Sequence, residues 1–243
     1  MNVHMGNKDF NNIYLTGDTH GDFHELVKLT RSIGITERDL LIILGDVGVN
    51  FTNEIRDVYS KSSLSLIPAA ILCVHGNHER RPTSPDIRWQ YEEKEWMGGT
   101  VWVEKEFPTI LFAKDGCHYH VNERTLFVIG GAYSMDKPLR LRMDYPWFPD
   151  EQPSEEIREF CMSELEKHGW REDVVLSHTC PYDLRPMDKL MPGLDESKVD
   201  SSTELFLQKI RERIIYNKWY CVQWHIDRKT PDIEFLYRKV TML

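Results

Sequence analysis

Residues 13–20 read IYLTGDTH, a short apolar run that ends abruptly in glycine and polar residues. The same pattern returns in residues 40–46, LLIILGD, and in residues 69–78, AAILCVHGNH. Short aliphatic runs bounded by turn residues predict strands that are buried on both faces. Apolar residues at helical spacing after the first run predict a helix from about Phe23 to Gly34. Strands alternating with helices favour an α/β fold, in which function gathers at the carboxyl ends of the strands.

The middle of the chain predicts a second or mixed sheet. Short strands are expected close together at residues 101–105, 110–114, 118–121 and 125–129, with turn residues between them. Ser154 is expected to cap one helix, and Ser201 with Glu204 has capping-box spacing ahead of another. Further strands are predicted at residues 174–176, 219–225 and 233–240. No linker or repeat is visible, so we interpret residues 1–243 as a single domain, with a segment, 1–12, that is flexible or lies at an edge.

Composition excludes several classes of function. The chain has 30 basic and 39 acidic residues and a formal net charge of −9, so no broad basic surface exists to bind nucleic acid or an anionic membrane non-specifically. A hydrophobic content of 41% supports a sizeable core, yet no apolar run is long enough to span a bilayer. The five cysteines form no paired motif and are interpreted as free thiols. With no export signal visible, we expect a cytoplasmic protein without membrane contact.

Carboxylate, imidazole and carboxamide side chains stand where the predicted strands end. They are Asp18, His20, Asp46, Asn77, His78, His178 and His225. The ends of neighbouring strands lie about 5 to 10 Å apart, and clustered carboxylates without a cation raise one another's pKa. The pattern therefore favours a pair of metal ions that share one carboxylate. The remaining histidines, His4, His24, His75, His118, His120 and His168, are assigned no function.

Five short motifs follow one another along the chain. They are Gly17-Asp18-Thr19-His20, Gly45-Asp46, Gly76-Asn77-His78-Glu79, Ser177-His178-Thr179 and Gln223-Trp224-His225. This series resembles the calcineurin-like metallophosphoesterase superfamily, in particular a bacterial or phage branch of it. The resemblance implies a four-layer α/β/β/α sandwich of two mixed sheets flanked by helices, and a metal-dependent hydrolase of phosphomonoesters or phosphodiesters.

The resemblance also implies a role for each strand-end residue. Asp18, His20 and His225 would hold one metal ion, Asn77 and His178 would hold the other, and Asp46 would bridge both. His78 would lie just outside the ligands, near the leaving-group oxygen, so that Asp46 and His78 are the implied catalytic residues. The implied chemistry is in-line attack of a metal-bound hydroxide on phosphorus. The two divalent ions are expected to be Mn²⁺, with Mg²⁺, Fe or Zn²⁺ as alternatives.

One position departs from the family pattern, which ends in a G-H-x-H motif. Aligning its last histidine with His225 puts Gln223 where the other metal-ligating histidine is expected. A glutamine oxygen suits Mg²⁺ or Mn²⁺ better than Zn²⁺, so we expect a weakened second site. The alternative alignment gives His225 the first histidine's place and makes Asp227 the last ligand.

The substrate is expected to be a small phosphoester. Arg81 and Arg140 are the candidates for gripping the phosphate, because Asp46 is not followed by the arginine of the related protein phosphatases. The loop that contains Arg140 also contains Tyr145, Trp147 and Phe148, which would favour a nucleotide-like substrate if they stack on a base. A second hypothesis is a metal-poor, catalytically weak scaffold that binds proteins.

Overall fold

The strands formed by the first three aliphatic runs lie side by side in the computed structural model, which describes residues 9–52, 54–190 and 196–243. They belong to a seven-stranded sheet in the order β13-β1-β2-β3-β6-β5-β4. The strands are β1 (Ile13–Thr16), β2 (Leu40–Ile43), β3 (Ala70–Cys73), β4 (Tyr91–Trp96), β5 (Gly99–Glu104), β6 (Ile110–Ala113) and β13 (Thr241–Met242). The pairs from β1 to β6 are parallel, and β13, β5 and β4 add antiparallel pairs at the two edges. The first sheet is therefore mixed.

A second, six-stranded sheet has the order β11-β12-β10-β9-β8-β7. Its strands are β7 (His118–Val121), β8 (Arg124–Ile129), β9 (Arg171–Ser177), β10 (Ile215–Cys221), β11 (Arg228–Lys229) and β12 (Glu234–Phe235). Strands β8, β9, β10 and β12 are parallel to one another, whereas β7 and β11 are antiparallel to their neighbours. Both sheets are mixed, as the family resemblance implied.

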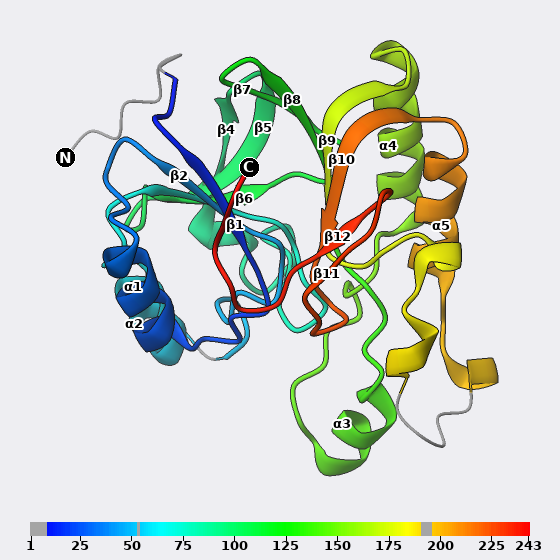
Figure 1. The fold of residues 1–243 in the computed structure, drawn as a ribbon. Coiled ribbons are helices and arrows are strands. Elements are labelled where there is room, and N and C mark those ends of the chain that lie inside the picture. Colours follow the sequence, from blue (N-terminus) through cyan, green and yellow to red (C-terminus); the bar gives the residue numbers. More distant parts are fainter. Residues whose placement is uncertain (1–8, 53, 191–195) are drawn as a thin grey trace.

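Helices cover the outer faces of the two sheets, as Figure 1 shows. They are α1 (Phe23–Ser32) and α2 (Glu54–Leu64) on the first sheet, and α4 (Glu155–Lys167) and α5 (Ser202–Arg211) on the second. The short helix α3 (Lys137–Met143) lies on a long excursion away from the sandwich. Four short 3-10 helices complete the described elements: Arg88–Gln90, Tyr182–Leu184, Met187–Lys189 and Glu196–Lys198. None of the described helices has the length and apolar character needed to cross a membrane.

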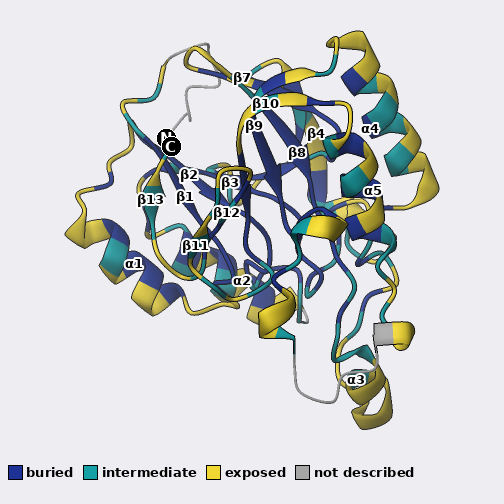
Figure 2. Cartoon of the chain, turned by 45° about the vertical axis from the view of Figure 1, so that its right-hand side comes forward, coloured by how far each residue is buried: buried dark blue, intermediate teal, exposed yellow. Residues whose placement is uncertain are grey.

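The strands are buried on both faces (Figure 2). The core therefore consists of three apolar clusters, one between the two sheets and one between each sheet and its helices. Along β2 the side chains alternate: Leu40 and Ile42 join the cluster between the sheets, and Leu41 and Ile43 join the cluster beneath α1 and α2. On the second sheet Val175 packs in a third cluster together with the buried faces of α4 and α5. This four-layer arrangement confirms the predicted fold class.

Several local predictions are confirmed. Helix α1 buries Phe23, Leu26, Val27 and Thr30, as the apolar spacing predicts. The Ser154 side chain accepts a hydrogen bond from the Ile157 backbone amide at the start of α4. All five cysteines are buried and free.

Other local predictions are wrong, for physical reasons that the structure shows. The four strands expected to form a second or mixed sheet are divided between two mixed sheets, because the chain crosses from the first sheet to the second between β6 and β7. The strand predicted to reach His225 ends at Cys221, where a turn bonds the His225 amide to the Val222 carbonyl. Of the strand expected at residues 233–240, only Glu234–Phe235 forms, as β12; the next strand, β13, begins at Thr241, after that range, and joins the other sheet.

The capping box at Ser201 does not form. The Ser201 side chain makes no cap hydrogen bond, and Asp200 accepts the hydrogen bond from the Ser202 amide instead. Glu204 is directed inward, to Thr179. Helices α2 and α3 and strand β4 were not predicted, and most of the N-terminal segment 1–12 lies outside the described residues.

Candidate metal centre

The loops that follow five strands meet at one edge of the sandwich. They bring together Asp18 and His20 after β1, Asp46 after β2, Asn77 and His78 after β3, His178 after β9, and His225 after β10. Parallel strands place their carboxyl ends on the same side of a sheet, which is why residues so far apart in sequence converge here. The structure thus joins all seven of the predicted strand-end residues in one region.

Unusual backbone conformations shape these loops. Asp18, His20, Asp46 and His225 all have positive φ values between 45° and 49°, a region that non-glycine residues seldom occupy. The loops approach so closely that a Cβ on Gly45 would clash with the His178 ring. Glycine is required at that position, and the strained turns direct the polar side chains into the site.

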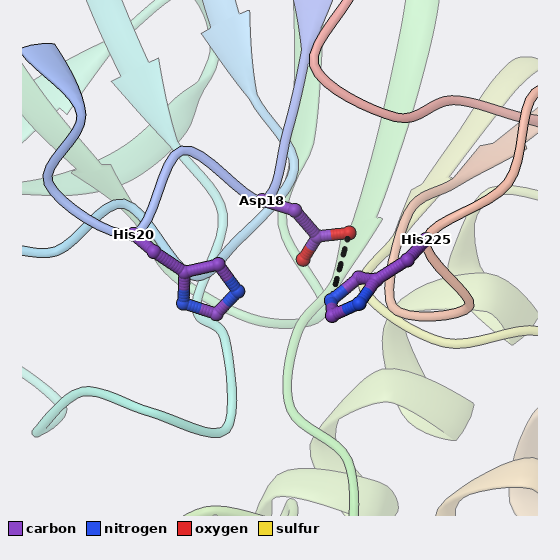
Figure 3. A group of neighbouring side chains, drawn as sticks. All are labelled: Asp18, His20 and His225. Carbon is purple, nitrogen blue, oxygen red and sulfur yellow. Dashed lines mark ion pairs between the residues drawn. The ribbon is translucent and has the colours of Figure 1, made fainter. Parts of the chain in front are cut away.

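Asp18 forms a group of potential metal ligands with His20 and His225. It is fully buried, and neither of its carboxylate oxygens has a hydrogen-bond partner among the described residues. His225 Nε2 lies 3.7 Å from Asp18 Oδ2, and His20 and His225 lie on opposite sides of the carboxylate (Figure 3). The ligand atoms of these three residues all lie within 4.8 Å of one another. A buried carboxylate without hydrogen bonds is costly unless a cation compensates it.

Asp46 connects the two halves of the site. Its Oδ2 lies 3.7 Å from His20 Nε2, and its Oδ1 lies 3.7 Å from His178 Nε2. Oδ1 also accepts a hydrogen bond of 2.9 Å from the backbone amide of His78. Asp46 belongs to one group of ligand-type atoms with Asp18 and His178, and to another with His20 and His78. One carboxylate therefore faces both groups, which is the geometry of a bridging ligand.

His178 and Asn77 present two acceptors to the same point. His178 Nδ1 lies 2.8 Å from the Leu44 carbonyl oxygen and must donate to it, so Nε2 of the neutral ring carries a lone pair. That Nε2 is 2.7 Å from Asn77 Oδ1, while the Asn77 amide group donates to Ser134 Oγ. Two acceptors this close repel each other unless a proton or a metal ion lies between or beside them.

The charges within the site are strongly coupled. Burial and the neighbouring Asp46 carboxylate raise the pKa of Asp18 well above its ordinary value. Burial alone would raise the pKa of Asp46, but any positive charge on His178, His78 or His20, together with the hydrogen bond from the His78 backbone amide, stabilises the carboxylate and lowers that pKa. Burial lowers the pKa values of His20, His78 and His225. The imidazoles are therefore biased toward the neutral form that binds metal ions.

Glu79 connects two of the loops that carry the site. It was not predicted to have a role. Its two carboxylate oxygens accept backbone hydrogen bonds of 2.8 Å from Gly76 and 3.0 Å from Val47. Burial, with the Asp46 charge, raises the pKa of Glu79 to about 8. The residue ties the loop that carries Asp46 to the loop that carries Asn77. The only signal in the sequence was its place directly after His78.

The structure favours the alignment that places the last histidine of the family pattern at His225. His225 groups with Asp18 and His20, whereas Asp227 belongs to no such group among the described residues. Asp227 Oδ1 accepts a hydrogen bond from the Tyr237 amide and lies 3.2 Å from Lys239 Nζ. Gln223 lies partly buried near the site, and its Nε2 donates to the Tyr133 carbonyl at 3.1 Å. That hydrogen bond leaves the Gln223 oxygen available.

The two predicted phosphate-binding arginines differ in their surroundings. Arg140, on α3, lies with Nη2 2.7 Å from His78 Nδ1 and Nε 2.8 Å from Asp136 Oδ2. Arg81 is buried, pairs with Asp115 and donates from Nε to the Asp150 carbonyl at 3.0 Å. Arg140 therefore adjoins the site, while Arg81 braces the surrounding loops.

The aromatic residues near Arg140 also divide. Phe148 is buried with its ring 5.9 Å from that of Phe51, and Trp147 Nε1 donates to Glu151. Tyr145 is 55% exposed. Phe148 and Trp147 therefore anchor the excursion, and Tyr145 is the aromatic side chain of this loop that is free to meet a ligand.

The chain was compared with protein families, curated proteins and solved structures. The family model described as calcineurin-like phosphoesterase matches residues 12–213. Among solved structures, TT1561 of Thermus thermophilus is similar, with 15% identity, 86% of this chain and 80% of that chain covered, and a TM-score of 0.47. The protein of unknown function AQ665 from Aquifex aeolicus has 12% identity, coverage of 72% and 81%, and a TM-score of 0.38. No curated protein matches the chain significantly.

Proposed function

Because the chain belongs to the calcineurin-like phosphoesterase family, we propose that it hydrolyses phosphoesters with the help of two divalent metal ions held by the strand-end residues. The observation that carries this proposal is Asp18, a buried carboxylate whose two oxygens lack hydrogen-bond partners within the described chain. It faces the imidazoles of His20 and His225. A buried acid in such surroundings has no structural purpose that would repay its desolvation, but it is suited to hold a cation.

The donor atoms divide naturally into two sets. Asp18, His20 and His225 would hold one ion, Asn77 and His178 would hold the other, and Asp46 would give one oxygen to each. Gln223 would contribute its side-chain oxygen to the second set. Carboxylate and carboxamide oxygens are hard ligands that suit Mn²⁺ or Mg²⁺, and the histidines also permit Fe or Zn²⁺, so Mn²⁺ is our first choice.

Two such ions, when bound, lower the pKa of a water molecule and offset the negative charge of the phosphoryl oxygens. The protein's own residues supply the rest of the chemistry. The Arg140 guanidinium can only donate, so His78 Nδ1 accepts its hydrogen bond and the proton of the neutral ring stays on Nε2. His78 Nε2 is then the atom that donates a hydrogen bond to a phosphoryl oxygen or to the departing alkoxide oxygen. Arg140 both fixes this tautomer and adds positive charge next to the substrate.

The substrate class follows from the surroundings of the site. A cavity lined by Tyr133, Met135 and Trp224 also reaches Gln223, next to the proposed second ion. Its wall combines aromatic and aliphatic side chains with Arg185, Ser201 and Glu204, and together with the exposed Tyr145 it suits a planar organic group attached to the phosphate. We therefore propose a small phosphoester with a nucleotide-like leaving group, hydrolysed in the cytoplasm.

A chromogenic assay tests the activity. Purified protein should release nitrophenol from mono- or bis(nitrophenyl) phosphate, lose this activity after exhaustive chelation, and regain it best with Mn²⁺. The ratio of the two rates would identify the monoester or diester preference. Activity that survives complete removal of metal would contradict the proposal.

The second hypothesis, a metal-poor scaffold, gains support from Gln223, because a glutamine stands where a histidine is expected. Metal content distinguishes the two hypotheses. Protein purified after growth in metal-replete medium should carry one or two ions per chain if it is a hydrolase. A content near zero, with no activity on adding Mn²⁺, would favour the scaffold.

A further inference from the structure

A separate group of metal-ligand residues lies where β7 meets the C-terminal end of α4. His118 begins β7, and Glu164 and His168 stand on the last turn of α4 and at its C-cap. One nitrogen or oxygen atom from each of these residues lies within 4.8 Å of the others. The group shares no residue with the candidate metal centre. Neither histidine follows a strand, so nothing in the sequence pattern indicated a role for them.

His118 is a buried imidazole beside a buried carboxylate. Its side chain is 3% exposed, and its Nε2 has no hydrogen-bond partner within the described chain. Nδ1 lies 2.7 Å from Oε1 of Glu172, which is itself buried, and the second oxygen of Glu172 has no partner among the described residues. A carboxylate placed at Nδ1 orients an imidazole so that Nε2 is directed to a metal ion.

His168 has the matching tautomer. Its Nδ1 lies 2.9 Å from the Glu164 carbonyl oxygen and must donate to it, which leaves the Nε2 lone pair free. Glu164 supplies a carboxylate, one oxygen of which lies 2.6 Å from Lys167 Nζ. The Lys167 side chain is 64% exposed, so an ion at Glu164 competes only with a hydrated ammonium group.

The rings of His118 and His168 are stacked, with centroids 3.6 Å apart and planes inclined by 21°. Each nitrogen lone pair lies in the plane of its own ring, so two stacked rings do not direct their lone pairs at one point between them. His168 is exposed and stands at the end of its helix, so its ring can rotate toward the common point while His118 stays fixed, at the cost of the hydrogen bond from its Nδ1 to the Glu164 carbonyl. Binding therefore requires a change in one surface side chain.

We propose that His118, His168 and Glu164 form a transition-metal site, best suited to Zn²⁺, that fastens β7 to the end of α4. Two imidazoles and a carboxylate are a common zinc donor set, and water or Glu172 completes the coordination. The site is structural and lies apart from the proposed hydrolysis, so it stands or falls independently of that function.

Zinc binding to the full chain tests this site. Chelator-treated wild-type protein and the variant His168→Ala are equilibrated with Zn²⁺ alone, and the bound ions per chain are measured after desalting and by competition with a chromogenic chelator. The variant should hold one tight Zn²⁺ fewer than the wild type, with affinity at that site reduced by at least about tenfold, as expected for loss of a ligand. Because the result is a difference, it does not depend on how many ions the other site holds.

The matched control is His120→Ala, which removes an exposed histidine from the same strand. It should bind as much zinc as the wild type. Glu164→Gln provides a second variant and should weaken the same site while unfolding at the same temperature as metal-free wild type. Equal zinc stoichiometry and affinity in wild type, His168→Ala and Glu164→Gln would overturn the proposal, even if phosphoesterase activity is present.

Discussion

Asp46 gives one carboxylate oxygen to each half of the site, with His20 on one side and His178 on the other. Replacing it by asparagine keeps the shape but removes the negative charge from both halves. We expect Asp46→Asn to reduce phosphoesterase activity on the order of 10²-fold or more at every metal concentration. Nitrophenyl phosphate hydrolysis measured across a Mn²⁺ titration checks this expectation.

Asp227→Asn is the matched control for that variant. Asp227 is also a carboxylate near His225 in sequence, but it bonds to Tyr237 and Lys239. Its replacement should leave the activity within about twofold of wild type. If the two variants behave alike, Asp46 has no special place in the chemistry.

A substitution at Gln223 is expected to strengthen metal binding rather than weaken it. An imidazole binds transition metals more strongly than a neutral carboxamide, so Gln223→His should tighten the weaker metal site. The expected result is a Mn²⁺ or Zn²⁺ titration of activity shifted to lower metal concentration by about tenfold. An unchanged titration would mean that Gln223 does not bind the ion.

At this scale the sequence was informative where a side chain follows a strand directly. Asp18 and Asp46 were predicted because a buried strand, a glycine and a ligand-type residue stand next to one another in the chain. Glu79 was missed because its partners are backbone amides of two loops. His118 and His168 were missed because packing, and not a motif, brings them together.

Helix α2 shows why some elements could not be predicted. Its buried face carries Asp57, Lys61 and Leu64, while Ile55 and Tyr59 are more than 70% exposed. The face of α2 that carries Ile55 and Tyr59 is exposed to solvent, so the apolar pattern of the sequence would have predicted the wrong buried face. The helix packs in this way because Lys61 Nζ lies 2.7 Å from Asp57 and 2.6 Å from Glu104 and donates to Tyr91.

This buried cation joins α2 to strands β4 and β5 and should be essential to the element's packing. Burial alone would lower the pKa of Lys61, but Tyr91, Asp57 and Glu104 raise it, so the amine stays charged. Lys61→Met leaves two buried carboxylates without their cationic partner. We therefore expect the free energy of unfolding to fall by about 3–5 kcal/mol. Urea denaturation of metal-free protein measures it.

Lys28 serves as the control for Lys61. It pairs with Glu25 on the surface of α1, where its side chain is 71% exposed. Lys28→Met should change the free energy of unfolding by no more than about 0.5 kcal/mol. A similarly small effect of Lys61→Met would show that the buried cluster contributes little.

For the whole molecule, Glu204 links the outer helix layer to the site. It lies on α5, is buried and accepts a hydrogen bond from Thr179, the residue after His178. Burial raises the pKa of Glu204 above its ordinary value of 4.5. The folded chain then binds this proton more tightly than the unfolded chain, so the contribution of Glu204 to stability falls as the pH rises from about 4.5 through the folded pKa.

Glu204→Gln removes this titration while keeping the acceptor for Thr179. Relative to wild type, the metal-free variant should become progressively more stable as the pH is raised from about 5 to about 8. Denaturation curves at several pH values give the difference in the free energy of unfolding, in which the other titrating groups cancel. A difference that does not vary with pH would contradict the raised pKa.

The architecture as a whole could be predicted from the family motifs, whereas the division of strands between sheets could not. Strands β4 to β6 and β7 to β8 have similar local patterns, and only long-range pairing assigns them to different sheets. Likewise, the short β12 and β13 are defined by their neighbours β10 and β1 rather than by their own residues.

The left-handed backbone at Asp18, His20, Asp46 and His225 sets activity against heat tolerance. Each such residue costs roughly 1–3 kcal/mol, which glycine would relieve. A mutant library screened only for thermostability should therefore lose side chains at these very positions, giving a more stable fold without the proposed hydrolysis. Laboratory selection of a robust form would have to retain hydrolysis as a criterion from the first round.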